Sequence, residues 1–521
     1  MISAVTHSLH LARAGFVLAR EGVFSLVDPS PLPAPARFAI RVARLFERPK
    51  VAGRNRLPAA LTRLGPTYVK LGQFLATRQD VVGLALSRDL ESLQDRMAPF
   101  PQGEAEATVA RAFDKPVAQI FKSFGPPVAA ASIAQVHKAE TLDGRTVAVK
   151  VLRPHVEQRL RSELQSFFFA ARFAEERSAE ARRLRLVEVV DTLSRSVTVE
   201  MDLRLEAAAL SEMAENTKED AEFRVPTVDW NYTGKDVLTL EWIEGTPLTD
   251  RGTLAAKGYD LPQLGRTVIQ SFLRHAMRDG FFHADMHPGN LFVDHDGKLV
   301  AVDFGIMGRL GPKERRFLAE ILHGFITRDY LRTAQVHFDA GYVPPQHSVE
   351  AFAQAIRAIG EPIHNRTAED ISMAKLLTLL FEVTAIFDMK TRPELLLLQK
   401  TMVVVEGVAR TLDPKLDMWT TAEPVVREWI TRNLGPVGRI EDAVGGVTEI
   451  GGFLGQVPGL LTRASRITDQ LDAATRDGLV LAPETIAAIG KAEAHRNRSS
   501  TTALWVIAIL LLILIIGLFA Y

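Results

Sequence analysis

Two short polar segments with a predicted hairpin between them constrain this chain more than any other feature. The segment HADMHPGN (283–290) places Asp285 and Asn290 five residues apart, on a path that Pro288-Gly289 keeps out of a helix. The apolar runs 290–293 and 299–302 follow and predict two short strands. The second strand delivers Asp303 onto the glycine turn Asp303-Phe304-Gly305. The fold must therefore hold an Asp–Asn loop beside an aspartate that follows a strand.

The same three parts occur in protein kinases, in the same order. There, an Asp that faces the nucleophile and a metal-holding Asn have this five-residue spacing, and a second metal-holding Asp begins a DFG turn. Upstream, Val147-Ala148-Val149-Lys150 resembles the strand whose lysine orients the ATP phosphates. Together these parts predict ATP binding by Lys150, catalysis by Asp285 and Mg²⁺ binding by Asn290 and Asp303. His283, Asp285 and His287 could instead begin a zinc site, which would need ligands from elsewhere in the chain.

Three departures separate the sequence from ordinary protein kinases. The loop upstream of Lys150 reads AAASIAQV (129–136) and lacks the glycines that let backbone N–H groups approach phosphates closely. Ala284 stands where most kinases have an arginine, and no Ala-Pro-Glu follows Asp303. A platform for protein substrates is therefore not expected.

With these departures the sequence resembles the UbiB family, also called the AarF-domain or ABC-one atypical kinases. Lys70-Leu71-Gly72-Gln73 resembles the family's KxGQ motif, and Ala129 to Ser132 its alanine-rich loop. Glu200-Met201-Asp202 resembles the ExD motif, followed by Glu206. The resemblance implies two groups of site residues. The ATP-binding group is Ala129, Ala130, Ala131, Ser132, Val136, Lys150 and Glu206, and the regulatory group is Lys70, Gly72, Gln73, Glu200 and Asp202.

The resemblance implies how the acidic residues are used, and helix geometry shows which of them share a face. On one continuous helix Asp202 and Glu206 share a face, whereas Glu200 points to another side. We expect Glu206 to pair with Lys150. We expect Glu200 and Asp202 to meet Lys70, which would then lie across the mouth of the site.

Composition excludes several classes of function. The 62 basic residues balance 62 acidic ones, so a broad electrostatic grip on nucleic acid is not expected. The chain has no cysteine, which excludes disulfides, thiolate metal sites and cysteine nucleophiles.

The C-terminal segment predicts a membrane anchor. Residues 503–521 (ALWVIAILLLILIIGLFAY) carry no charge, and as a helix they would span about 28 Å, close to the ~30 Å hydrocarbon thickness of a bilayer. Basic residues at 491–498 precede this run, so the positive-inside rule keeps the body of the protein in the cytoplasm. We expect a single-pass C-terminal anchor in the cell inner membrane.

The remaining pattern predicts an α+β protein with a two-lobed, protein-kinase-like fold. We expect a helical extension with the KxGQ motif (1–110), an N-lobe (111–245), a helical C-lobe (246–435), a linker or helical region (436–500) and the anchor (501–521). Residues 4–24 predict an amphipathic helix packed on the body rather than resting on a membrane. The range 156–185 predicts an inserted helix, and 225–243 predicts two strands joined near 233–235.

The resemblance implies an ATP- and Mg²⁺-dependent ATPase or atypical kinase that supports ubiquinone biosynthesis. Polyprenylphenol-type membrane lipids are the implied substrates. Other ubiquinone biosynthesis proteins and a second copy of this chain are compatible partners. The alternatives are a nucleotide-regulated pseudokinase that acts as a scaffold and a small-molecule phosphotransferase. The phosphotransferase shares the Asp–Asn loop but does not explain the KxGQ segment or the anchor.

Overall fold

The computed structural model describes most of the chain up to residue 434. The described ranges are 2–26, 34–48, 55–76, 97–177, 179–361 and 393–434, with isolated positions between them. Across these ranges, no helix combines the length and the apolar character needed to cross a bilayer. The predicted region 436–500 and the predicted anchor 501–521 lie outside the described residues.

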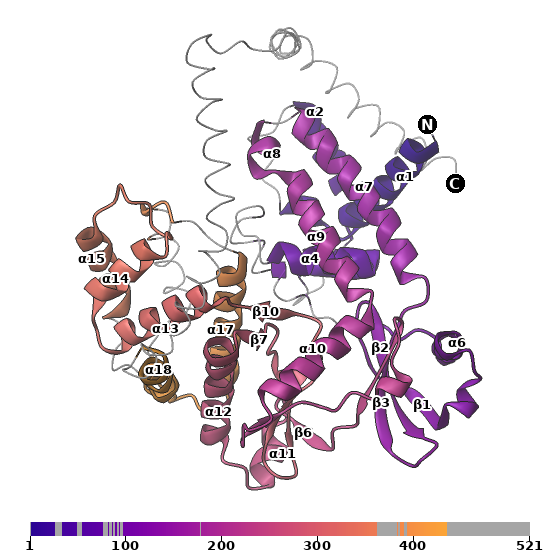
Figure 1. Cartoon of the computed structure of the whole chain (residues 1–521). Coiled ribbons are helices and arrows are strands. Elements are labelled where there is room, and N and C mark those ends of the chain that lie inside the picture. The colour runs from indigo at the N-terminus through magenta and orange to yellow at the C-terminus, as the bar shows by residue number, and fades with distance from the viewer. Residues whose placement is uncertain are drawn as a thin grey trace, which may run out of the picture.

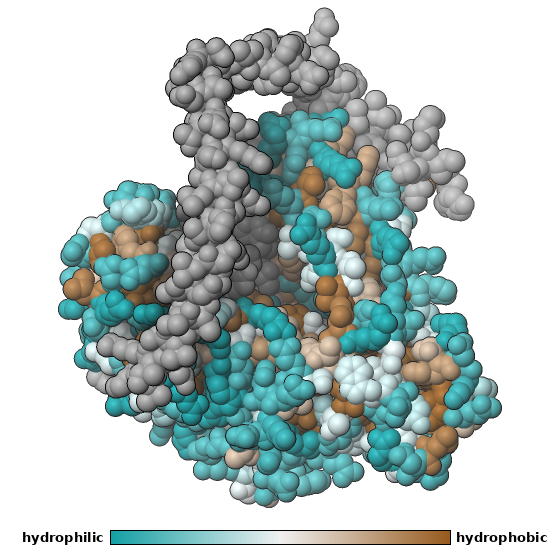
Figure 2. Space-filling model, in the orientation of Figure 1, coloured by the Kyte–Doolittle hydropathy of each residue, from teal (hydrophilic) through white to brown (hydrophobic). Residues whose placement is uncertain are grey.

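A bundle of helices forms the first part of the protein (Figure 1). It comprises α1 (Ile2–Arg20), α2 (Ala34–Arg44), α3 (Arg56–Leu64), α4 (Pro66–Ala76), α7 (Val156–Arg177), α8 (Ala179–Leu184) and α9 (Leu186–Glu200). The predicted N-terminal helix packs on the body: His7 and His10 each bond the buried Ser166 of α7, at 3.1 and 3.2 Å. The inserted helix predicted over 156–185 corresponds to α7 and α8. On the face shown in Figure 2, hydrophobic residues lie scattered among hydrophilic ones over these helices.

The joint between α3 and α4 depends on one glycine and one arginine. Gly65 has φ of 112°, a conformation that side chains disfavour, and Pro66 starts α4 with a preset φ. A Cβ on Gly65 would also lie 2.5 Å from Nη2 of Arg159 on α7. The Arg159 guanidinium donates to the carbonyl of Leu64, the last residue of α3, at 2.8 Å, so the joint is tied to α7.

The smaller lobe is a four-stranded antiparallel sheet with the order β1-β2-β3-β5. Its strands are β1 (Phe121–Ala130), β2 (Ala134–Thr141), β3 (Thr146–Leu152) and β5 (Val237–Glu241), with α6 (Gln102–Phe113) on one face and α10 (Leu203–Asn216) beside the other. Alternation along β3 explains this placement. Val147, Val149 and Val151 are buried in a cluster with Val109 of α6, whereas Lys150 faces the α10 side.

The predicted pair of strands over 225–243 is present only in part: β5 forms, but the first predicted strand is reduced to an antiparallel bridge between Val228 and Leu240. After this bridge the chain forms a 3₁₀ turn (Trp230–Tyr232), which Asp229 caps by accepting the N–H of Asn231. Thr239 adds a bond from its hydroxyl to the Tyr232 carbonyl at 2.6 Å. Asp and Asn compete for local backbone groups in this way, which a count of apolar residues does not detect.

The larger lobe is mainly helical. Its helices are α11 (Arg251–Ala256), α12 (Leu261–Arg274), α13 (Pro312–Ile326), α14 (Tyr330–Asp339), α15 (Val349–Gly360), α17 (Pro393–Leu412) and α18 (Met418–Leu434). The larger lobe also contains two small sheets. One has the order β4 (Phe223–Arg224), β9 (Leu299–Ala301), β8 (Leu291–Asp294) and β6 (Gly245–Pro247), and the other pairs β10 (Met307–Arg309) with β7 (Phe281–His283). The predicted hairpin between the polar segments is therefore present as β8 and β9.

Close packing in the β7–β10 pair gives a first prediction. A Cβ on Gly308 would lie 2.1 Å from Cζ of Phe282, whose ring is 1% exposed and cannot move aside. We expect Gly308→Ala to lower the free energy of unfolding by about 2 kcal/mol through overpacking. Gly252→Ala is the control, because its nearest atom would be 3.7 Å away. Equal denaturation midpoints for the Gly308 variant and the wild type would contradict this prediction.

Candidate active site

Lys150 joins the two lobes. Its Nζ donates to both carboxylate oxygens of Glu206 on α10, at 2.8 and 3.0 Å, and to Oδ1 of Asp303 at 3.0 Å. The Glu206 side chain is 7% exposed and that of Asp303 is 44% exposed. The predicted pairing of Lys150 with Glu206 is present, and Asp303 keeps one side accessible to a ligand.

Strand register aligns three of the predicted ATP-binding residues. Ala129 on β1 lies opposite Val136 on β2, and Val136 lies opposite Lys150 on β3. Directly opposite residues in a sheet present their side chains on the same face. Ala130 ends β1, and Ala131 with the buried Ser132 forms the turn into β2, so the alanine-rich loop lies at the edge of this face.

Backbone contacts fix Glu206 and Asp303 relative to each other. The N–H of Phe304 donates to Oε1 of Glu206 at 3.3 Å, and the N–H of Gly305 donates to Oδ1 of Asp303 at 3.3 Å. Asp303 has a positive φ of 68°, which is uncommon outside glycine and which aspartate tolerates better than most residues. This backbone conformation turns the chain sharply after β9, at the residue predicted to hold a metal.

The Asp285–Asn290 loop is held from both ends. Asn290 Nδ2 donates to the carbonyl of Asp285 at 3.1 Å and approaches its Oδ2 at 3.4 Å. The N–H of Asp285 donates to Nδ1 of the buried His283 at 3.0 Å, and Thr401 of α17 donates its hydroxyl to the Ala284 carbonyl at 3.0 Å. The sequence alone did not indicate these two supporting roles of His283 and Thr401. Only the supporting role of His283 could have been suspected from the sequence, because His283 lies two residues before Asp285.

Charge pairing sets the protonation of the central groups. Burial opposes charge on Lys150, but Asp303 and Glu206 outweigh it and raise the pKa of Lys150. Burial likewise favours neutral Asp303, but Lys150, with a smaller contribution from Lys70, lowers the pKa of Asp303 to about 2. Both groups are therefore charged near neutral pH.

The lowered pKa of Asp303 predicts a pH-dependent contribution to stability. Its ordinary value is 3.8, so ionised Asp303 stabilises the fold above about pH 4, and this contribution is lost as the pH falls toward 2. Because the side chain is 44% exposed, solvent screening limits the effect to about 1 kcal/mol. The difference in unfolding free energy between wild type and Asp303→Asn should shrink by about half of that amount between pH 6 and pH 3, because the rest is lost only as the pH falls further toward 2. A difference that is constant over this range would contradict the lowered pKa.

The KxGQ helix forms an ion pair with the first residue of the ExD motif. Lys70 on α4 lies 2.6 Å from Oε2 of Glu200, and both side chains are about one-tenth exposed (11% and 10%). The predicted pairing of Lys70 with Glu200 is therefore present. Lys70 also contributes, as the smallest of several causes, to the low pKa of Asp303.

The assumption of one continuous helix over 200–206 is wrong. α9 ends at Glu200, and Asp202 caps the new helix α10 by accepting the Arg204 N–H at 3.1 Å. The Arg204 side chain adds two bonds to the Asp202 carboxylate, at 2.8 and 2.6 Å. Asp202 therefore caps α10 and pairs with Arg204, where the sequence predicted a partner for Lys70.

The other two KxGQ residues lie on the same helix. A Cβ on Gly72 would lie 2.6 Å from Cδ1 of Leu61 and 2.9 Å from Cδ1 of Leu93, so glycine allows α4 to pack closely. Gln73 is half-buried beside it. These contacts explain why position 72 requires glycine for packing. A regulatory role for Gly72 or Gln73 stays a prediction.

The donor set suits Mg²⁺ better than zinc. An Asn amide oxygen and an accessible carboxylate are hard oxygen donors, and Mg²⁺ takes few protein ligands alongside phosphate and water. The zinc alternative lacks support: the described residues contain no cluster of three or more His, Cys, Asp or Glu side chains placed to hold a metal. The Nδ1 atoms of both candidate histidines already accept backbone N–H groups, from Asp285 and Gly289.

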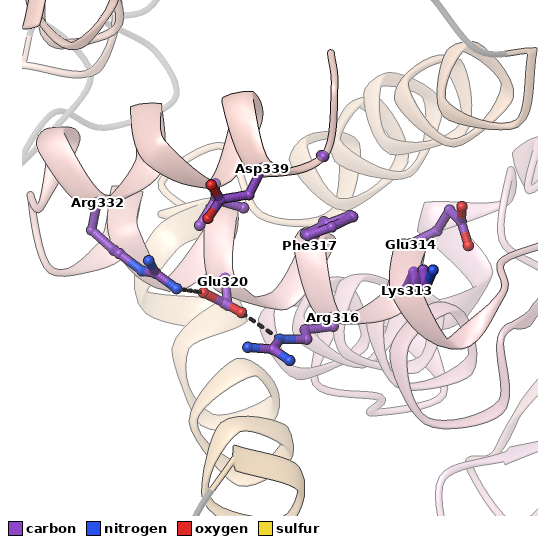
Figure 3. A pocket seen from close by; sticks show the side chains of 9 residues that line it. Lys313, Glu314, Arg316, Phe317, Glu320, Arg332 and Asp339 are labelled. Atoms are coloured by element: carbon purple, nitrogen blue, oxygen red, sulfur yellow. Dashed lines mark hydrogen bonds and ion pairs between the residues drawn. The ribbon is translucent and has the colours of Figure 1, made fainter. Parts of the chain in front are cut away.

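A cavity of about 490 Å³ lies elsewhere, between α13 and α14 (Figure 3). Glu320 is held there by Arg316, at 2.8 Å, and by Arg332. None of the predicted site residues lines it. Because protein arginines neutralise its central carboxylate, Glu320 is not available to bind a metal ion or to accept a proton in phosphoryl transfer.

Family profiles match two parts of the chain. The ABC1 atypical kinase-like domain matches residues 92–337, and the UbiB helical domain matches residues 356–417. A relative from Marinobacter nauticus, named probable protein kinase UbiB, is 40% identical over 444 residues, which cover 84% of this chain and 81% of that protein. The chain belongs to the UbiB family. A relative from Azotobacter vinelandii with the same name is 39% identical over 78% of this chain and 76% of its own length.

Membership of the UbiB family settles the class of fold. The α+β, kinase-like assignment is confirmed, with the sheet lobe and about half of the helical lobe inside the ABC1 match. Among solved structures, the Rv3197–erythromycin complex from Mycobacterium tuberculosis aligns with 71% of this chain and 95% of that chain, at 24% identity and a TM-score of 0.49.

Proposed function

We propose that this UbiB-family protein is an ATPase or atypical small-molecule kinase that supports ubiquinone biosynthesis at the membrane. The observation that carries the proposal is the bonding of Lys150 to both Glu206 and Asp303. A lysine held in this way presents a fixed charge to the phosphates of a nucleotide. Asp285 and Asn290 meet in one loop on the other lobe, as phosphoryl transfer requires.

Each residue has a distinct role in this proposal. Lys150 orients the phosphates, and Glu206 holds Lys150 in place. Asn290 and Asp303 would hold Mg²⁺, which neutralises phosphate charge when it is bound. Asp285 accepts the proton of the attacking hydroxyl, which belongs to a lipid or to water. Catalysis rests on positioning and charge, with no covalent step on the protein.

The surroundings of the site favour a lipid over a protein substrate. The pair Lys70–Glu200 ties α4 to the end of α9, and the sequence lacks the Ala-Pro-Glu segment of protein-substrate platforms. An anchor at 501–521 would hold the cytoplasmic body at the inner membrane, beside polyprenylphenol-type precursors. Other ubiquinone biosynthesis proteins, or a second copy of the chain, could assemble with it there.

One observation favours a second function, that of a nucleotide-regulated scaffold with little turnover. The alanine-rich loop is held by protein contacts, since the Ala131 carbonyl accepts from Arg153 at 2.9 Å. A restrained loop that lacks glycines approaches phosphates less closely than a glycine-rich one. Slow chemistry follows from such a loop, and bound nucleotide could still regulate the protein.

Quinone-lipid profiles of cells test the proposal. Cells whose only copy is Asp285→Asn or Lys70→Ala should contain at least about tenfold less ubiquinone than wild type and should accumulate a precursor. The control is Arg161→Gln, which alters an exposed ion pair on α7. Normal ubiquinone in both variants would contradict the pathway assignment. If Asp285→Asn restores ubiquinone while Lys150→Met does not, the scaffold is the correct function.

A further inference from the structure

The alanine-rich loop is held from outside the site by one arginine. Arg153 follows the end of β3, and its Nη2 donates to the Ala131 carbonyl at 2.9 Å and to the Ala98 carbonyl at 2.8 Å. Its Nε also reaches the Ala131 carbonyl, at 3.3 Å. One guanidinium therefore bonds both the loop and the segment that connects the helical extension to α6.

The loop has little freedom once these contacts form. The N–H of Ala131 donates to the Ala134 carbonyl at 2.8 Å, and the Ala130 carbonyl accepts the N–H of Met97 at 3.2 Å. Both backbone polar groups of Ala131 are thus engaged by the protein. Alanine also lacks the positive-φ freedom by which glycine-rich loops adapt to phosphates. A loop of this composition must be set in place by its surroundings.

The segment that Arg153 reaches is itself fixed on the sheet. The Arg153 guanidinium lies 5.4 Å from the centre of the Phe100 ring, which is 9% exposed. The Phe100 N–H donates to Oε1 of the buried Gln135 of β2 at 3.0 Å, and Nε2 of the same side chain donates to the Phe100 carbonyl at 3.3 Å. The segment 97–100 is therefore a rigid support, and Arg153 links it to the loop by a side chain, beside the backbone bond from Met97 to Ala130.

We propose that Arg153 is a positioning residue that holds the alanine-rich loop in the conformation that binds nucleotide. The inference rests on the proposed function of the site. The segment 150–153 then supplies both parts of phosphate binding, since Lys150 contacts the phosphates and Arg153, three residues later, fixes the loop. Without the guanidinium, the Ala131 carbonyl loses its partner and the loop becomes less ordered in the nucleotide-free protein. Nucleotide binding must then order the loop, which weakens the affinity for MgATP.

The test compares Arg153→Met, which keeps a stem over Phe100, with Arg153→Lys in the full-length chain. We expect Arg153→Met to raise the dissociation constant for MgATP about tenfold, with turnover at saturating MgATP changed less than about twofold. Arg153→Lys should recover part of this loss. Arg161→Met on α7 is the control, because that arginine is exposed and contacts neither segment.

Hydrogen exchange of the nucleotide-free protein separates this inference from the proposed function. In Arg153→Met the amides of residues 130–134 should exchange at least about tenfold faster, with the amides of β3 unchanged. Unchanged exchange at 130–134 would overturn the restraint. Faster exchange with an unchanged or lower dissociation constant for MgATP would overturn the positioning role. A wild-type chain that binds no MgATP would overturn the proposed function, while exchange alone would still decide whether Arg153 holds the loop.

Discussion

Asp285→Asn should lower the rate of ATP hydrolysis by about 1,000-fold, with the dissociation constant for MgATP within about threefold of wild type. The amide cannot accept the proton of the attacking hydroxyl, and general-base catalysis contributes about 10²–10⁴-fold. The loop should keep its shape, because Asn290 bonds mainly the Asp285 backbone carbonyl, at 3.1 Å. Phosphate release and nucleotide titration on the same preparation measure the two quantities.

The matched control for this variant is Asp296→Asn. Asp296 is exposed in the turn between β8 and β9, and the same change there should leave hydrolysis unchanged. Equal hydrolysis by Asp285→Asn and wild type, with and without liposomes, would remove Asp285 from the reaction. If the affinity for MgATP falls as much as the rate of hydrolysis, Asp285 contributes to nucleotide binding and not to catalysis.

Lys150→Met should affect both nucleotide affinity and stability. We expect the dissociation constant for MgATP to rise about 100-fold, because the phosphates lose the cation that contacts them. We also expect the free energy of unfolding to fall by about 3 kcal/mol, because Glu206 is left buried without its partner. Calorimetric titration and chemical denaturation measure the two effects.

A second substitution separates these effects. Lys150→Met/Glu206→Met removes both buried charges and should recover most of the lost stability, while nucleotide affinity stays low. Recovery of affinity together with stability would show that Lys150 acts only through the fold. If Lys150→Met alone is as stable as wild type, Lys150 does not stabilise the buried Glu206.

The sequence predicted the parts of the site that are local in the chain. Asp285, Asn290 and Asp303 lie in short segments whose spacing follows from the β8–β9 hairpin between them, so their proximity could be inferred directly. The pairing of Lys150 with Glu206 crosses 56 residues and was predictable only through the resemblance to a family. The same is true of Lys70 and Glu200.

Contacts that depend on exact backbone paths were not predictable. Met201 and Asp202 interrupt the helix that periodicity suggests over 200–206, because Asp202 is a better cap than an interior residue. The Thr401 hydroxyl donates to the Ala284 carbonyl beside the Asp285–Asn290 loop from 117 residues away, and no local pattern marks it. The role of Arg153 likewise depends on two carbonyl acceptors in different segments, which the sequence does not bring together.

Calorimetric titration of the full-length chain with ATP, in the presence and absence of Mg²⁺, tests the central claim most directly. If Asn290 and Asp303 hold Mg²⁺ beside Lys150, wild type should bind ATP at least about tenfold more tightly with Mg²⁺ than with EDTA. Asp303→Asn should lose this difference. Absence of ATP binding by wild type, or an equal Mg²⁺ dependence in Asp303→Asn, would contradict the proposed Mg²⁺–ATP site.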